Sequence, residues 1–192
     1  MHTLIFATNN RNKVAEIQSL VGANFTIIPL KEAGIDIDIP EPHDQLEANA
    51  LEKAMTIFNM TNQNCFSEDT GLEILALDGA PGVKSARYAG ENSNPQANID
   101  LVLSKMTGVE NRTAQFRTVI CLIWENQTYY FEGICKGQIL NHMQGENGFG
   151  YDPIFVPDGA SKSFANMTME EKNTYSHRKK AVTQLFDFLG TV

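Results

Sequence analysis

Strand-sized apolar runs that alternate with helix-periodic stripes constrain the fold of this chain most. Residues 3–7 form an apolar run that predicts a buried strand. After a polar turn, apolar residues recur at helical spacing until Gly22 ends the pattern, at Val14, Ile17, Leu20 and Val21. A second strand-like run follows at residues 25–30. Because strands and helices follow one another in this way, the sequence predicts the α/β class.

The rest of the chain continues this pattern. A helical stripe is expected from residue 44 to about residue 62, and short strands are expected at 64–67 and 72–77 around a turn at 68–71. Capping signals mark later helix starts at Asn94-Pro95, at Thr168 with Glu171, and at Ser176.

Two β-rich runs in the second half of the chain, at 113–124 and 128–134, flank the polar residues 125–127 and predict a hairpin. A hairpin beside crossover helices predicts a mixed sheet. No internal repeat, low-complexity tract or linker interrupts the pattern, so we expect residues 1–192 to form a single domain.

Charge and composition argue against several classes of function. A hydrophobic fraction of 42% and a charged fraction of 20% are typical of a globular protein rather than a disordered one. The net charge of -8 gives no sign of a basic face, so we expect no nucleic-acid partner. The apolar runs are too short to cross a membrane, and the first residues lack a signal-peptide pattern. Cysteines without metal-like spacing predict buried free thiols in the cytoplasm, at Cys65, Cys121 and Cys135.

The polar turn after the first strand is a candidate phosphate site. It contains Thr8, Asn9, Asn10, Arg11, Asn12 and Lys13. A helix N-terminus offers backbone N–H groups and partial positive charge, and Lys13 adds a full charge. The alternative is that an asparagine only caps the helix while Lys13 is solvated, since the glycines of a Walker loop are missing.

A set of carboxylates forms a candidate catalytic and magnesium site: Glu41, Glu47, Glu68 and Asp69. Mg²⁺ prefers oxygen ligands and needs few carboxylates when phosphates supply the rest, and a carboxylate can also deprotonate water. Adjacent side chains in a regular strand point to opposite faces, so Glu68 and Asp69 can share a site only where the strand breaks. Thr70 and Gly71 are expected to supply that break. The alternative is an ordinary acidic surface turn.

Three further groups of residues could bind a nucleotide. Asn49 and Lys53 lie on one helix face off the apolar stripe, although an ordinary exposed face has the same pattern. The aromatics of a glycine-hinged segment could stack on a base or pack in the core, in the run Phe149, Gly150, Tyr151 and Asp152. Lys172, His177 and Arg178 bring cations to a helix start, or form a solvated basic face.

In this order, these segments resemble the inosine triphosphate pyrophosphatase family. The resembling pieces are TNNRNK at 8–13, LEANALEKA at 46–54, SEDTGL at 67–72, GAPGVKSARYAG at 79–90, GFGYDPIF at 148–155 and EEKNTYSHR at 170–178. The match covers nearly the whole chain. It implies Mg²⁺-dependent hydrolysis of the purine triphosphates ITP, dITP and XTP to the monophosphate and pyrophosphate. It also implies a homodimer and an elongated α/β fold, with a long twisted mixed sheet flanked by helices and two lobes around a central cleft.

The resemblance assigns roles to matching positions. Asp69 would activate the attacking water, with Lys13 and Lys53 as catalytic cations, and Mg²⁺ would be served by Glu41, Asp69 and Glu68. The substrate would contact Thr8, Asn9, Asn10, Arg11, Asn12, Lys13, Asn49, Thr70, Phe149, Gly150, Tyr151, Asp152, Lys172, His177 and Arg178. The chain departs from the family pattern at Asn9, which is usually glycine, at Glu68, often aspartate, and at Thr70, often serine. The longer Glu68 side chain bears directly on how the metal would be held.

Three other interpretations are compatible with parts of the sequence. One is a nucleotide pyrophosphatase of the Maf type that acts on pyrimidine or modified nucleotides. The others are an inactive nucleotide-binding module and a dimeric structural protein without a ligand. The carboxylate at Asp69 and the nearly complete motif set favour the purine triphosphatase.

Overall fold

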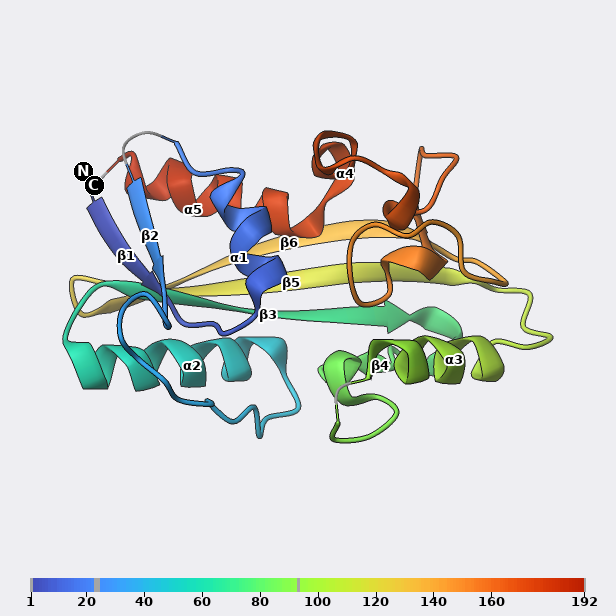
Figure 1. Ribbon diagram of the computed structural model, residues 1–192, viewed down its shortest axis with the longest axis horizontal. Helices are drawn as coiled ribbons and strands as arrows, with labels where there is room; N and C mark the ends of the chain where they lie inside the picture. Colours follow the sequence, from blue (N-terminus) through green and yellow to red (C-terminus); the bar gives the residue numbers. More distant parts are fainter. Residues whose placement is uncertain (1, 23–24, 93, 192) are drawn as a thin grey trace. The chain divides into compact units, whose positions relative to one another are not determined.

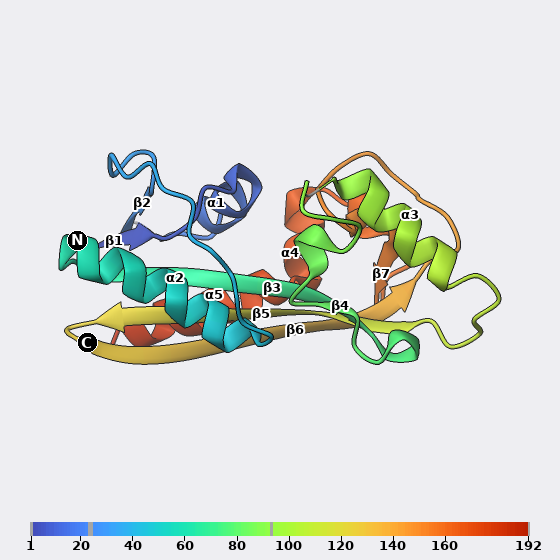
Figure 2. The same cartoon turned by 90° about the horizontal axis from the view of Figure 1, so that it is seen from below.

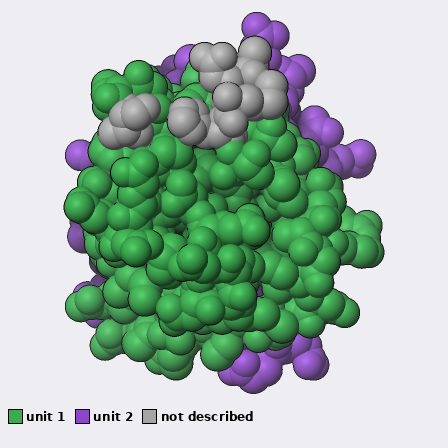
Figure 3. All heavy atoms as spheres, turned by 90° about the vertical axis from the view of Figure 1, so that its left-hand side faces the viewer, with its two compact units in different colours: residues 1–69, 118–133, 178–192 green, residues 70–117, 134–177 purple. Residues whose placement is uncertain are grey.

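The computed structural model describes residues 2–22, 25–92 and 94–191. The chain forms two compact units, each assembled from separate stretches of sequence (Figure 3). Unit 1 comprises Met1–Asp69, Thr118–Gly133 and Arg178–Val192, and unit 2 comprises Thr70–Arg117 and Ile134–His177. The boundaries fall inside strands and at a helix start, which explains why no linker marks them in the sequence.

The strands form one seven-stranded sheet in the order β2-β1-β3-β5-β6-β7, with β4 beside β3 (Figure 1). Their bounds are β1 His2–Phe6, β2 Phe25–Pro29, β3 Cys65–Ile74, β4 Pro81–Gly82, β5 Thr113–Trp124, β6 Gln127–Ile139 and β7 Phe155–Pro157. Strand β1 is parallel to β2 and β3, whereas β4 is antiparallel to β3 and β7 is antiparallel to β6. The predicted mixed sheet is therefore confirmed.

Unit 1 carries helices on both faces of its part of the sheet (Figures 1 and 2). Helices α1 (Arg11–Gln18) and α5 (His177–Leu189) pack on one face, where a core forms around Phe6 and Phe66. Helix α2 (Leu46–Thr61) covers the other face. The α2 helix lies close to β3 because small residues meet there: the Cys65 thiol donates to the carbonyl of Ala54 at 3.3 Å.

Unit 2 contains helices α3 (Pro95–Lys105) and α4 (Met169–Tyr175) and the short 3-10 helices Leu75–Leu77, Ser85–Arg87, Asp152–Ile154 and Phe164–Asn166. The predicted caps at Asn94 and Thr168 are confirmed. The Asn94 side chain accepts from the Ala97 N–H at 3.1 Å, and Thr168 and Glu171 form a reciprocal capping box. The core of this unit includes Leu72, Ile99, Phe116, Phe155 and Phe164.

The largest departure from the sequence-based expectation lies in β3. Two short strands around a turn at 68–71 were expected, but β3 is one continuous strand from Cys65 to Ile74. Gly71, expected to break the strand, instead permits a close approach of β4, because a Cβ there would lie 2.6 Å from the carbonyl oxygen of Gly82. The prediction of a turn was wrong because a glycine inside a strand can serve strand packing as well as chain reversal.

The remaining differences are at element ends. Helix α1 ends at Gln18, earlier than the expected stop at Gly22. The β5–β6 hairpin turns through Glu125 and Asn126, which both have positive φ, as a two-residue hairpin turn requires. Cys65, Cys121 and Cys135 are free and buried as predicted. Among the described residues, none of the helices combines the length and the apolar character needed to span a membrane.

Candidate active site

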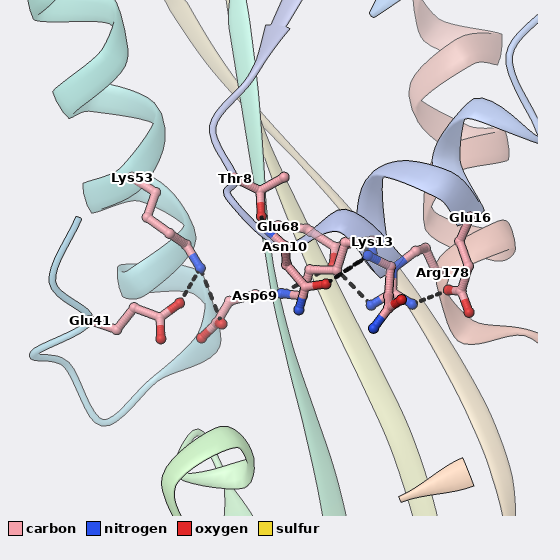
Figure 4. A network of polar contacts seen from close by, with 10 residues as sticks. Thr8, Asn10, Lys13, Glu16, Glu41, Lys53, Glu68, Asp69 and Arg178 are labelled. Carbon is pink, nitrogen blue, oxygen red and sulfur yellow. Dashed lines mark hydrogen bonds and ion pairs between the residues drawn. The ribbon is translucent and has the colours of Figure 1, made fainter. Parts of the chain in front are cut away.

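The loop between β1 and α1 combines a helix cap with charged and polar side chains (Figure 4). The Asn10 side chain caps α1 by accepting from the N–H groups of Asn12 at 3.0 Å and Lys13 at 3.2 Å. Thr8 supports the loop, because its hydroxyl accepts from the Asn10 N–H at 3.2 Å. Asn9 to Asn12 are exposed, while Thr8 and Lys13 are half-buried. Asn10 therefore caps the helix, as the alternative interpretation expected. The exposed residues of the loop remain accessible to a phosphate.

Glu68 and Asp69 are adjacent in a regular strand and therefore face opposite sides of β3. Glu68 faces α1 and α5, where Arg178 donates to both of its oxygens, from Nε at 2.8 Å and from Nη2 at 2.9 Å. Arg178 also pairs through Nη1 with Glu16 of α1, and the Lys13 ammonium lies 3.2 Å from Glu68. The expectation that the two acids share one site at a strand break was wrong, because the strand does not break.

The Glu68 side has opposite charges in close contact and away from water. Burial raises the pKa of Glu68, but the charges of Arg178 and Lys13 outweigh it and hold the pKa at about 2. Burial lowers the pKa of Arg178, and Glu68 and Glu16 more than reverse that effect. Two carboxylates here face two cations, so the group is electrically balanced.

Asp69 faces α2, where Lys53 reaches it (Figure 4), and Asn49, one turn earlier in α2, reaches it as well. The Lys53 ammonium donates to Asp69 Oδ1 at 3.3 Å and to Glu41. The Asn49 amide donates to Asp69 Oδ2 at 3.3 Å. Asn49 is 1% exposed and Lys53 7% exposed, so the alternative of an ordinary solvated helix face does not hold for either residue.

On the Asp69 side, burial and neighbouring charges leave the carboxylate with a raised pKa. Burial lowers the pKa of Lys53, but the carboxylates of Asp69 and Glu41 raise it and leave it above its usual value. Burial raises the pKa of Asp69, the cations Lys53 and Lys13 lower it, and Glu41 raises it, with a net upward shift. Both Asp69 and Glu41 contact the ammonium of Lys53. A carboxylate with a raised pKa is suited to accept a proton.

The surroundings of Glu41 and Asp69 fit a magnesium ion that is shared with phosphates. Within the described ranges, no group of three or more acidic, histidine or cysteine side chains is arranged to hold a metal. Mg²⁺ usually takes one or two carboxylates and completes its shell with water and phosphate oxygens, which is what Glu41 and Asp69 offer. Glu68 fits this role poorly, since both of its oxygens already accept from Arg178.

Unit 2 has a buried ion pair of its own, between Asp152 and Lys172. The Lys172 ammonium lies 2.7 Å from Asp152 Oδ2 and over two aromatic rings, 5.1 Å from the Phe149 centroid and 5.2 Å from that of Phe164. The same Asp152 oxygen accepts from the Phe149 N–H at 2.9 Å. Gly148 has positive φ and no space for a side chain beside Asp152. The glycine-hinged segment thus holds a carboxylate, a cation and an aromatic ring together.

Other predicted site residues of unit 2 are mainly buried in its core. Tyr151 is 4% exposed and its hydroxyl donates to the Ser85 carbonyl at 2.8 Å. The His177 ring stacks on Phe116 with centroids 4.7 Å apart. Gly150 has positive φ, and Thr70 is a half-buried residue of β3. Their predicted contacts with a substrate remain predictions.

Glu16, the second carboxylate that pairs with Arg178, was not among the predicted site residues. Glu16 is 4% exposed and lies one turn after Lys13, beside the buried Ile17. A charged residue next to the apolar stripe of a short helix was the available signal. Its partner, 162 residues further along the chain, could not be identified from the spacing within α1.

Comparisons with known proteins show the family of the chain. The chain matches the model of the Ham1 family over residues 4–188. It is 49% identical to a protein of Flavobacterium johnsoniae named dITP/XTP pyrophosphatase, with 97% of each chain covered, and 49% identical to a Porphyromonas gingivalis protein of the same name, with 98% of each covered.

Solved structures give the same result. The structure of the Staphylococcus aureus Ham1 protein matches with a TM-score of 0.89 at 36% identity, covering 98% of both chains. A HAM1 protein from Coxiella burnetii matches with a TM-score of 0.90 at 34% identity over the full length of both. The predicted family and α/β fold are confirmed, and the chain belongs to the Ham1 family.

Proposed function

We propose that this chain hydrolyses non-canonical purine nucleoside triphosphates, namely ITP, dITP and XTP, to the monophosphate and pyrophosphate. The observation that carries the proposal is full-length similarity to proteins named dITP/XTP pyrophosphatase. The surroundings of Asp69 supply a chemical reason, since a buried carboxylate with a raised pKa lies beside cations that can hold phosphates.

In this proposal Asp69 accepts the proton of the attacking water. The Asn49 amide and the Lys53 ammonium orient its two oxygens separately, at 3.3 Å each. Lys13 and Lys53 stabilise the negative charge of the phosphates, together with the N-terminus of α1. This chemistry depends on positioning and charge, and it needs no covalent nucleophile.

We further propose that catalysis depends on Mg²⁺, held by Glu41 and Asp69 together with phosphate oxygens. The ion would supply neutralisation of phosphate charge when bound. Without it, Glu41 and Asp69 share the charge of Lys53.

Base recognition is assigned to the unit 2 group around Lys172. Hypoxanthine and xanthine present a carbonyl at position 6, where adenine presents an amino group. A donor such as the Lys172 ammonium matches a carbonyl and mismatches an amino group, and unmatched buried polar groups can discriminate by roughly 10⁴ or more. Phe149 would offer its ring face to the base. Arg178, which was predicted for the same role, pairs with Glu68 and Glu16 in unit 1, and its contact with the base stays a prediction.

A homodimer in the cytoplasm completes the proposal. The dimer rests on the family resemblance, and the compartment on three free, buried cysteines. Light scattering at several protein concentrations would test the oligomeric state.

The test of the proposed function is release of pyrophosphate from ITP, XTP, GTP, ATP and dTTP, with and without Mg²⁺, beside an Asp69→Asn control. We expect Mg²⁺-dependent release from ITP and XTP, and a loss of about 10²- to 10⁴-fold in kcat for Asp69→Asn. Release from dTTP instead would favour the Maf-type activity. Absence of release from every nucleotide would favour a binding module.

A further inference from the structure

The segment that carries Glu41 has little regular structure of its own. Residues 35–43 form neither helix nor strand. Its first residue, Ile35, has an N–H that donates at 2.9 Å to the carbonyl of Leu30, the residue that follows β2. Glu41 nevertheless reaches the Lys53 ammonium, so other contacts must hold the segment against α2.

Asn49, in the first turns of α2, provides those contacts. Its Oδ1 accepts from the His43 N–H at 3.0 Å, and its Nδ2 donates to the His43 carbonyl at 3.1 Å. The amide therefore pairs with both backbone groups of His43, as a neighbouring strand would. The same Nδ2 donates to Asp69 Oδ2 at 3.3 Å.

A second, weaker tether lies nearer the start of the segment. The Asn9 amide of the β1–α1 loop donates to the Ile37 carbonyl at 2.7 Å. Asn9 is exposed, whereas Asn49 is 1% exposed. Water competes more strongly with the exposed Asn9 contact than with the part-buried contacts of Asn49, so Asn49 is the stronger support.

We propose that Asn49 is a positioning residue that fixes the Glu41 segment and Asp69 relative to each other, rather than a residue that binds substrate. One rigid amide on a helix touches the backbone two residues after Glu41 and the carboxylate of Asp69. Loss of the Asn49 amide would release the Glu41 segment, and with it Glu41, from Lys53. It would also leave Asp69 with one fewer hydrogen-bond donor. The role in catalysis rests on the proposed function, but the tether itself does not.

The first experiment is hydrogen exchange of the substrate-free protein. In Asn49→Ala we expect exchange within residues 36–43 to be at least about tenfold faster at the His43 amide, which donates to Asn49, while the amides of α2 beyond its first turn stay protected. Asn49→Leu keeps a similar side-chain volume and removes all three hydrogen bonds, so its exchange should be as fast as that of the Ala variant. Because it leaves no cavity, the Leu variant keeps the test available if the Ala variant folds poorly.

Asn98 offers a matched control. It is a buried helical asparagine of unit 2 whose Oδ1 accepts from the Ala89 N–H at 2.7 Å and whose Nδ2 donates to the Ala86 carbonyl at 2.9 Å. Asn98→Ala should speed exchange at residues 86–89 and leave 36–43 unchanged. Faster exchange at 36–43 in both variants would mean general destabilisation and would overturn the proposal.

The second experiment is kinetic. With ITP, Asn49→Ala should lower kcat by about tenfold or more and raise the half-saturating Mg²⁺ concentration, with little change in KM for the nucleotide at saturating Mg²⁺. Unchanged exchange at 36–43 with a raised nucleotide KM alone would make Asn49 a substrate contact instead. If the unaltered protein does not hydrolyse ITP, the proposed function fails, and the exchange result still decides whether Asn49 holds the segment.

Discussion

The two faces of β3 in unit 1 carry neighbouring carboxylates in opposite situations. On one face, Glu68 is held by Arg178 and Lys13, and its pKa falls to about 2. On the other face, Asp69 shares Lys53 with Glu41, and its pKa is raised. The strand pleat separates two acids that are adjacent in sequence.

The difference teaches how one strand supports both stability and chemistry. On the Glu68 side, the charges of Glu68 and Glu16 are matched by those of Arg178 and Lys13, which suits a structural role. On the Asp69 side, burial and the nearby Glu41 carboxylate leave the pKa of Asp69 raised, which suits a group that accepts a proton. Lys13 links the two, because its charge lowers the pKa of both acids.

The strongest test of this comparison removes the cation from each face in turn. Arg178→Met leaves Glu68 and Glu16 buried without their main partner, and we expect a loss of about 3–5 kcal/mol in the free energy of unfolding. Lys53→Met should cost less, because the Glu41 side chain is 22% exposed and can turn to water. Denaturant unfolding of both variants measures this. An equal or larger loss for Lys53→Met would contradict the assignment of Arg178 to stability.

An intermediate effect is expected in acid. The folded pKa of Glu68 is about 2 against an ordinary value of 4.5, so Glu68 stabilises the fold fully above about pH 4.5 and loses that contribution as the pH falls towards about 2. Linkage makes this on the order of 3 kcal/mol. Glu68→Gln should therefore flatten the pH dependence of stability from about pH 5 down to about pH 3.

The measurement is denaturant unfolding of Glu68→Gln and the unaltered protein at each pH. Asp69→Asn is the matched control on the opposite face. Because the folded pKa of Asp69 is raised, its removal should not flatten the acid limb. If the free energy of unfolding depended on pH in the same way in Glu68→Gln and the unaltered protein, Glu68 would not be an ionised group stabilised by Arg178 and Lys13.

The smallest change in stability is expected for Lys13→Met. Glu68 keeps both of its bonds to Arg178, and the Lys13 side chain is 16% exposed, so the cost should be about 1 kcal/mol or less. Activity should respond more: kcat/KM for ITP should fall, and the acid limb of the pH–rate profile should move to higher pH because Lys13 lowers the pKa of Asp69. A large loss of stability with unchanged kcat/KM would place Lys13 with the structural group instead.

Local signals in the sequence predicted much of the fold. The caps at Asn94 and Thr168 act within three residues, so their geometry could be inferred from spacing alone. The continuity of β3 could not be inferred from local spacing, because at Gly71 it depends on the backbone of Gly82. Long-range pairing decided whether that glycine made a turn or a close contact.

The candidate site also has features that could be predicted from the sequence and features that could not. The family resemblance identified Asp69, Lys53 and Glu41, and they lie together. The face of β3 on which each acid lies followed from strand continuity and was not predicted. Glu16 remained unrecognised because its partner Arg178 is 162 residues away in sequence.

The alternation of Glu68 and Asp69 also bears on how β3 finds its place during folding. A slip of one residue would turn Glu68 towards α2 and leave Arg178, with Glu16, facing a different side chain. The buried guanidinium would then lack its bidentate partner, which is costly in a site without water. The alternation of Glu68 and Asp69 along β3 therefore also favours the native strand register. Forms of the sheet in which β3 is shifted by one residue are destabilised, whether or not a substrate is bound.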